Sequence, residues 1–251
     1  MKRKYEIAVL SKGDYARTVR IYAPKGADRA VIMHDGQNVF YDDEAAYKKS
    51  WRVLDILKRC GAKNTAVIGI DCTDTRIDDY LPFPIEFEQY GLPKGGGKTD
   101  IYCDYIYSTV LPYLEKRFNF KHYAMLGSSA GSTATLYYAA RKDPRIKAYG
   151  LFSPPLFLCP AAFDKFLNET EYDSSALYFV YCGGSETADA GEYSKLVPDL
   201  YVDSTYALIK SLRRGGAKSV RVRLENEAVH DEISWRKPEL EFYDDFSKAQ
   251  F

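Results

Sequence analysis

The sequence predicts an α/β protein with a mainly parallel central sheet of about eight strands and helices on both faces. After the first two strands, short β-rich apolar runs alternate with longer helical patterns, as they do in βαβ units. Runs such as 66–70 (AVIGI) and 177–180 (LYFV) are apolar throughout, which indicates strands buried on both faces. Alternation of this kind implies right-handed crossovers and parallel neighbouring strands.

The first half of the chain is expected to open with a hairpin. Its strands lie at 5–11 and 17–24, joined through the turn-forming Lys-Gly-Asp at 12–14. The next elements are a strand at 29–35, a helix at 50–60 that ends at Gly61, a strand at 64–71, and a helix at 100–118 bent at Pro112.

The segment 73–99 is predicted to be long and irregular. It directly follows the strand at 64–71. Loops of this length inside a compact domain are usually functional or mobile. We therefore expect it to wall one side of the site.

The second half of the chain continues the alternation to a last strand. Its elements are expected at 122–129 (strand), 131–142 (helix), 148–154 (strand), 163–170 (helix), 177–184 (strand), 204–216 (helix) and 219–226 (strand). We find no repeat, low-complexity segment or linker, so residues 1–251 are predicted to be a single domain.

Composition limits the classes of partner. The 35 basic residues balance 35 acidic ones, which gives no reason to expect nucleic acid or an anionic membrane. No apolar stretch approaches the roughly 20 residues of a membrane span, and the N-terminus lacks the features of a signal peptide. The five cysteines have no metal-ligand or redox spacing and are interpreted as reduced thiols, so a cytoplasmic location is expected. With only three histidines, a metal site is not expected.

Ser129 is the predicted nucleophile. Residues 127–131 (GSSAG) match G-x-S-x-G, the pattern of a sharp turn that lifts a serine out of the sheet between a strand and a helix. The pattern alone is a weak signal, but an apolar strand precedes it and a helix rich in small residues follows it. Ser128 and Ser132 are the alternatives, and neither has glycines at both flanking offsets.

His230 is the predicted base. It follows the last strand, at the edge of the sheet where Ser129 lies. His122 begins the strand that leads to Ser129 and therefore lies about 20 Å away, at the opposite edge. His34 lies at the correct edge but within the segment that would build the oxyanion hole, so a structural role is expected for it.

Two carboxylates can serve as the acid that orients the base. Glu186 and Asp189 both follow the strand at 177–184, and we favour Glu186 because it is nearer the strand end. Either one could instead cap the following helix. Asp231 adjoins His230 in sequence and would have difficulty facing its ring.

Backbone N–H groups complete the expected site. Ala130, at the start of the helix after Ser129, would donate to a developing oxyanion. Gly36 or Gln37 would supply the second donor, since they follow the strand at 29–35.

These motifs together resemble the putative esterase family, which includes esterase D and enterochelin-esterase-like hydrolases. The shared segments are MHDGQNVF, GIDCTDTRIDDYLPFP, GGGKTDIYCDYIYSTVLPYLEKRF, LGSSAGS, CGGSE and VHDEISWR, in this order between about residues 29 and 245. The resemblance implies an α/β-hydrolase fold, hydrolysis of a carboxylic ester and no cofactor. It assigns Ser129 as nucleophile, His230 as base and Glu186 as acid.

The substrate is expected to be a small-molecule ester. An acyltransferase that passes the acyl group to a sugar or thiol, and an inactive binding protein on the same fold, are the alternatives. Arg76 could receive an anionic substrate group, although a solvated arginine is the more common case. Tyr80, with Tyr90 and Tyr102, could form an aromatic platform for a sugar ring or a phenolic acyl group, or simply pack. The natural ester and the oligomeric state stay open.

Overall fold

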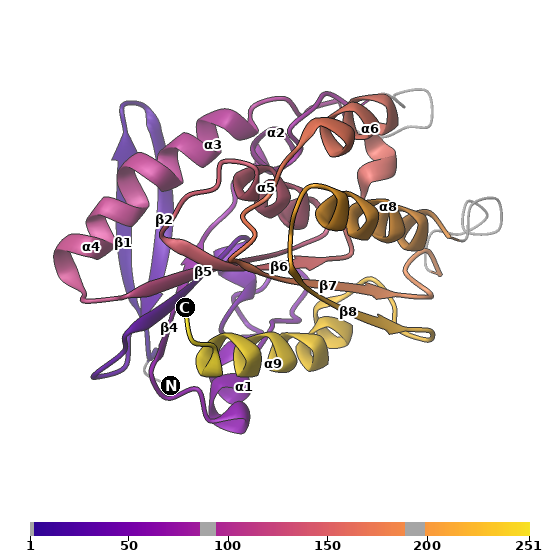
Figure 1. Ribbon diagram of the computed structural model, residues 1–251. Coiled ribbons are helices and arrows are strands. Elements are labelled where there is room, and N and C mark those ends of the chain that lie inside the picture. The colour runs from indigo at the N-terminus through magenta and orange to yellow at the C-terminus, as the bar shows by residue number, and fades with distance from the viewer. Residues whose placement is uncertain (1–2, 86–93, 189–198) are drawn as a thin grey trace.

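The strands form a mainly parallel sheet. A computed structural model describes residues 3–85, 94–188 and 199–251, and within them eight strands lie in the order β1-β2-β4-β3-β5-β6-β7-β8 (Figure 1). β1 pairs antiparallel with β2, and β2 with β4, whereas all later pairs are parallel. The strands are β1 (Glu6–Lys12), β2 (Tyr15–Tyr22), β3 (Arg29–Met33), β4 (Thr65–Ile70), β5 (His122–Ser128), β6 (Ile146–Phe152), β7 (Leu177–Gly183) and β8 (Ser219–Glu225).

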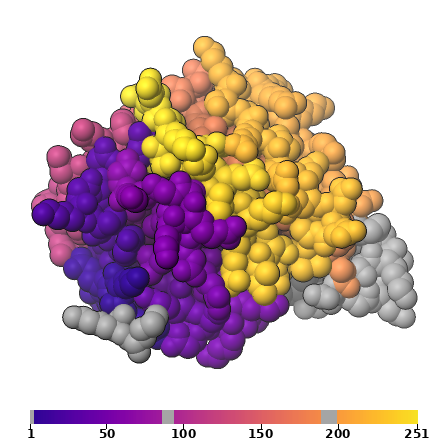
Figure 2. Space-filling view, turned by 90° about the horizontal axis from the view of Figure 1, so that it is seen from below, coloured from indigo at the N-terminus to yellow at the C-terminus, as the bar shows by residue number. Residues whose placement is uncertain are grey.

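Helices cover both faces of this sheet. One face carries α1 (Val53–Cys60) and α9 (Glu232–Lys248), which lie side by side in Figure 2, purple and yellow respectively. The other face carries α2 (Arg76–Tyr80), α3 (Thr99–Tyr105), α4 (Leu111–Arg117), α5 (Ala130–Ala139), α6 (Pro160–Glu169) and α8 (Leu200–Arg214) (Figure 1). The predicted α/β class, with its mainly parallel sheet of about eight strands and two helical layers, is confirmed.

The apolar strands are explained by burial on both faces. Side chains of successive strand residues point to opposite faces of a sheet. In β3, Ala30 and Ile32 pack into the larger core beneath α3 to α8, whereas Val31 and Met33 pack into the core beneath α1 and α9. A polar residue at any of these positions would be buried without water, which is why the run is apolar throughout.

The predicted helix at 100–118 contains an irregularity next to Pro112. Between α3 and α4, residues Ile106–Val110 form a π-helical segment, and Pro112 lies in the first turn of α4. Proline has no N–H to donate to the carbonyl four residues earlier, and a wider turn accommodates this loss. The segment 73–99 also differs from expectation, because its first part forms α2 and is not irregular.

The C-terminal helix α9 is a feature that our sequence analysis missed. Its buried positions have helical spacing and comprise Glu232, Trp235, Pro238, Glu239, Phe242, Tyr243 and Phe246. The Asp231 side chain caps the helix by accepting a hydrogen bond from Ser234 N–H at 2.8 Å. Pro238, inside the helix, and a high density of charged residues obscured this periodicity.

Candidate active site

Ser129 stands in a strained turn between β5 and α5. Its φ of 52° and ψ of −133° place it in a region that residues with a Cβ rarely adopt. The Ser129 N–H donates to the Phe152 carbonyl of β6 at 2.9 Å, which holds the turn against the sheet. A Cβ on Gly127 would lie 2.2 Å from the Gly131 carbonyl oxygen, so this turn closes only with glycine at position 127.

The amino end of α5 points toward the same turn. Ala130 is the first residue of this helix, and the first N–H groups of a helix have no partner within it. The helix dipole adds positive partial charge at this end. The Ala130 N–H is therefore suited to stabilise negative charge next to the Ser129 side chain.

Glu186 and His230 are brought together from two neighbouring strand ends. The His230 Nδ1 and the Glu186 Oε2 are 2.5 Å apart. The Glu186 side chain is 2% exposed and that of His230 is 24% exposed, so the carboxylate is buried beneath a ring that reaches the surface. Asp189 and Tyr90, the other predicted acid and a predicted platform residue, lie outside the described residues.

The second carboxylate oxygen of Glu186 is also held. Its Oε1 accepts hydrogen bonds from the Ser153 hydroxyl at 2.6 Å and from the Gly183 N–H at 2.7 Å. The Trp235 Nε1–H donates to the Ser153 hydroxyl at 3.1 Å and thereby links α9 to this carboxylate. Three donors, counting His230, leave the Glu186 side chain little freedom to turn.

Close contact between two loops makes this arrangement possible. The Gly184 N–H donates to the Glu225 carbonyl at 2.8 Å, and the Ser185 N–H donates to the Ala228 carbonyl at 3.0 Å. A Cβ on Gly183 would lie 2.3 Å from the Ala228 carbonyl oxygen. The glycine pair after β7 therefore allows the Glu186 turn to lie directly against the loop that carries His230.

Gly36 and Gln37 lie in a short turn after β3. Asp35 has a φ of 54°, and residues Gly36–Asn38 form one 3₁₀ turn. The Gln37 side chain faces Cys72, since its Nε2 lies 3.0 Å from the Cys72 Sγ and its Oε1 accepts the Cys72 N–H at 3.1 Å. Because the turn begins at Gly36, the N–H groups of Gly36 and Gln37 have no partner within it.

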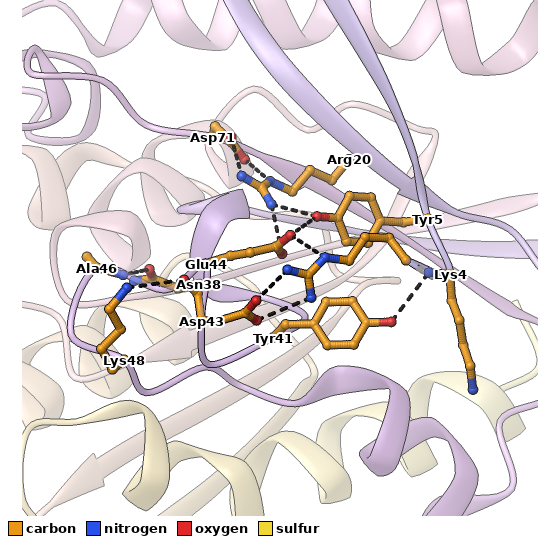
Figure 3. Close-up of polar contacts among 11 residues, drawn as sticks. Lys4, Tyr5, Arg20, Asn38, Tyr41, Asp43, Glu44, Ala46, Lys48 and Asp71 are labelled. Carbon is orange, nitrogen blue, oxygen red and sulfur yellow. Dashed lines mark hydrogen bonds and ion pairs between the residues drawn. The ribbon is translucent and has the colours of Figure 1, made fainter. Parts of the chain in front are cut away.

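A polar network centred on Arg20 packs against the Gly36–Asn38 turn (Figure 3). Arg20 of β2 donates to both Asp71 carboxylate oxygens, at 2.7 and 2.9 Å, and its Nη1 lies 2.9 Å from the Glu44 Oε2 and 2.8 Å from the Tyr5 hydroxyl. Burial raises the pKa of Asp71. A Cβ on Gly36 would lie 2.6 Å from the Asp71 Oδ1, so the network and the turn are in direct contact.

Arg76 is committed to an internal partner. Its Nε and Nη2 donate to the two carboxylate oxygens of Asp35 at 2.7 and 2.9 Å. Burial raises the pKa of Asp35, but the adjacent Arg76 guanidinium outweighs it and holds that pKa below its usual value. Arg76 therefore stabilises the backbone that leads into Gly36. Asp35 already balances the positive charge of Arg76, which was predicted to pair with an anionic group of the substrate.

Tyr80, which was predicted to contact the substrate, is buried and bonded within the protein. Its side chain is 1% exposed, and its hydroxyl accepts the Asp35 N–H at 3.0 Å. Tyr102 is equally buried and its hydroxyl lies 2.7 Å from the His34 Nδ1. In this structure both rings therefore pack in the interior, which is the alternative to a substrate platform.

The two remaining histidines are placed as expected. His122 begins β5, at the opposite edge of the sheet from Ser129. His34 is buried between Tyr102 and Thr135, with its Nε2 3.0 Å from the Thr135 hydroxyl. Burial lowers the pKa of His34 to about 4, so this ring is neutral near pH 7.

Our sequence analysis missed three residues of the site. Ser153 and Trp235 hold Glu186, and Tyr201 of α8 lies against His230 with a ring-centroid distance of 4.6 Å. Trp235 lies in the VHDEISWR segment, but no pattern there indicates that its indole reaches the end of β6.

Two classes of feature are absent from the part of the chain that the structure describes. No group of three or more His, Cys, Asp or Glu residues there could hold a metal ion. None of the helices described combines the length and apolar character needed to cross a membrane.

Sequence comparison relates the chain to one family. The family model described as "Putative esterase" matches residues 13–186, a range that contains Ser129 and Glu186. No curated protein matches the sequence.

Solved structures share this fold at low sequence identity. The IroE-like serine hydrolase from Shewanella oneidensis superposes with a TM-score of 0.76 at 17% identity, over 97% of this chain and 80% of that one. The siderophore hydrolase EstA from Aspergillus nidulans gives 0.75 at 18%, over 98% and 95%. The enterobactin esterase FES from Shigella flexneri gives 0.72 at 14%, over 98% of this chain but 59% of its own. These likenesses confirm the predicted α/β-hydrolase fold.

Proposed function

This chain belongs to the putative esterase family and is a carboxylic-ester hydrolase, and on that premise we propose that it acts through a triad of Ser129, His230 and Glu186. The observation that carries the proposal is the convergence of three loops at the carboxyl edge of the sheet. The strained turn after β5 presents Ser129. Glu186 follows β7 and His230 follows β8, and the hydrogen bond between them orients the imidazole.

The proposed reaction passes through an acyl-enzyme. His230 takes the Ser129 proton as the serine oxygen attacks the ester carbonyl, and it then gives that proton to the leaving alcohol. The N–H groups of Ala130 and of the Gly36–Gln37 turn stabilise the tetrahedral oxyanion. Water then attacks the acyl-enzyme by the same route and releases the acid.

The proposed triad is only partly connected by hydrogen bonds. Among the described residues, no hydrogen bond joins the Ser129 hydroxyl to His230, whereas His230 is already bonded to Glu186. Catalytic hydrogen bonds are often long before a substrate binds and shorten in the complex.

The test is the variant Ser129→Ala, with Ser128→Ala as its matched control. Turnover of p-nitrophenyl butyrate is expected to fall by about 10⁴-fold or more in S129A and to change little in S128A. A fluorophosphonate probe should label the wild-type protein and S128A but not S129A. Retained turnover or labelling in a pure S129A preparation would refute this nucleophile.

We propose a small-molecule ester as the substrate, and its acyl and alcohol groups remain to be identified. Two neighbours are named as a siderophore hydrolase and an enterobactin esterase, so siderophore esters are the first substrates to assay. Feruloyl and short-chain acyl esters complete the panel, since another neighbour is named as a ferulic acid esterase. The ratio of kcat/KM values across this panel identifies the preferred acyl and alcohol groups.

A further inference from the structure

Tyr201 is held in one orientation beside the proposed base. It is the second residue of α8, and its ring lies 4.6 Å from the His230 ring, centroid to centroid, at an interplanar angle of 37°. The Phe157 ring contacts it edge-on at 5.0 Å and 85°. With rings on two sides, the phenol has little freedom to turn away from the site.

The hydroxyl end of Tyr201 is directed toward the nucleophile. The Ser129 side chain lowers the pKa of this phenol, which indicates that the Tyr201 hydroxyl lies near it. Burial raises the pKa of Tyr201 well above its usual value, and this effect outweighs the lowering that Ser129 causes. The phenol therefore keeps its proton at neutral pH and remains a hydrogen-bond donor.

This position lies beside the path of the leaving alcohol. In the proposed reaction the imidazole takes the proton of Ser129 and passes it to the alcohol oxygen, so that oxygen must lie close to both groups. A phenol whose ring packs against His230 and whose hydroxyl lies near Ser129 borders the same place. The expected oxyanion donors come from other segments, the start of α5 and the turn after β3.

We propose that Tyr201 is a further catalytic residue, whose hydroxyl donates a hydrogen bond to the alcohol oxygen of the ester as that oxygen leaves. The proposal rests on the triad of Ser129 and His230. The bond between the carbonyl carbon and the alcohol oxygen breaks, its electron pair stays on the oxygen, and His230 supplies the proton. The Tyr201 hydroxyl donates its hydrogen bond to that oxygen while negative charge builds up there. Tyr201 keeps its own proton throughout.

The test is the dependence of Tyr201→Phe on the leaving group. Phenylalanine keeps the ring against His230 and removes only the hydroxyl. Tyr206→Phe is the matched control, because Tyr206 lies on the same helix and is 56% exposed. Each variant is assayed with an ethyl ester and a p-nitrophenyl ester of the same acid, and kcat/KM is compared because it reports the acylation step.

The expected result is a selective loss. Ethoxide is a poor leaving group and needs the donor, so Y201F should lower kcat/KM for the ethyl ester by about 10- to 100-fold. p-Nitrophenolate is stable as an anion, so the loss for its ester should stay below about threefold. Y206F should change neither value. An equal loss for both esters, or no loss for the ethyl ester, would overturn the role of Tyr201.

A fluorophosphonate probe separates this proposal from the triad on which it rests. Its fluoride leaving group offers no alcohol oxygen, so Y201F should be labelled at nearly the wild-type rate. Failure to label the wild-type protein refutes the triad itself. If Y201F is labelled normally but loses kcat/KM equally for the ethyl and p-nitrophenyl esters, only the role of Tyr201 is refuted. Thermal melting of Y201F and Y206F confirms that both variants are folded.

Discussion

Two histidines stand at the same edge of the sheet in contrasting surroundings. His34 follows β3 and His230 follows β8, and each ring lies between two aromatic side chains. His34 is 4% exposed, and both of its nitrogens face neutral hydroxyl groups. The His230 Nδ1 faces the Glu186 carboxylate, and the ring reaches the surface.

The contrast shows that the partner of the imidazole, and not its position at the sheet edge, determines its chemistry. A positive charge on His34 would have no carboxylate in hydrogen-bonding contact and no water around it, so burial favours the neutral ring. A positive charge on His230 is balanced directly by Glu186. This difference is why we propose His230, and not His34, as the base.

The largest expected effect is the loss of activity when His230, the proposed base, is replaced. His230→Gln should lower kcat for p-nitrophenyl butyrate by about 10⁴-fold or more, because no base remains to accept the Ser129 proton. His34→Gln should lower kcat by less than about tenfold per folded molecule, because His34 only supports the loop. Comparable losses in both variants, with folded protein verified by circular dichroism, would contradict the assignment.

An intermediate effect concerns the pH dependence of stability. The unfolded chain binds a proton at His34 below about pH 6.5, whereas the folded protein does so only near pH 4. This ring therefore contributes its full stability above pH 6.5 and loses it as the pH falls toward 4, a change of about 3 kcal/mol in the free energy of unfolding.

Urea denaturation of the wild-type protein and of His34→Gln measures this change. The difference in unfolding free energy between the two proteins should narrow steadily from pH 7 to pH 4.5, since the glutamine cannot titrate. The other titrating groups are shared by both proteins and cancel in the difference. A difference that stays constant with pH would show that His34 takes up a proton in the folded state as easily as in the unfolded chain.

The smallest expected effect tests the support of Glu186. Ser153→Ala removes one of its donors and should lower kcat about 5- to 10-fold, with KM changed by less than about twofold. Trp235→Phe removes the hydrogen bond to Ser153 and should lower kcat less. Because the two side chains act in series, the double variant should be no worse than S153A alone. Strictly additive losses would mean that the two residues support the site independently.

Local patterns were sufficient to predict the strained turn at Ser129. The turn at Ser129 needs glycine at fixed offsets, an apolar strand before it and a helix of small residues after it, all within about 15 residues. Strand and helix periodicity placed the eight strands in the same way. The sequence also restricted the candidates for base and acid, since the fold brings strand ends to one edge.

Other features of the site depend on contacts between segments far apart in the chain. Tyr80 and Arg76 both bond to Asp35, and no spacing in the sequence signals these contacts. The Ser153 and Trp235 side chains meet across 82 residues.

The sequence by itself determined the class of fold, the strained serine turn and the short set of groups able to activate it, because these follow from backbone sterics and from periodicities within single elements. Only the tertiary structure decided which side chains surround His230, Glu186 and Tyr201. The reason is physical: the partner of a buried polar group depends on which donor or acceptor packing places within about 3 Å of it.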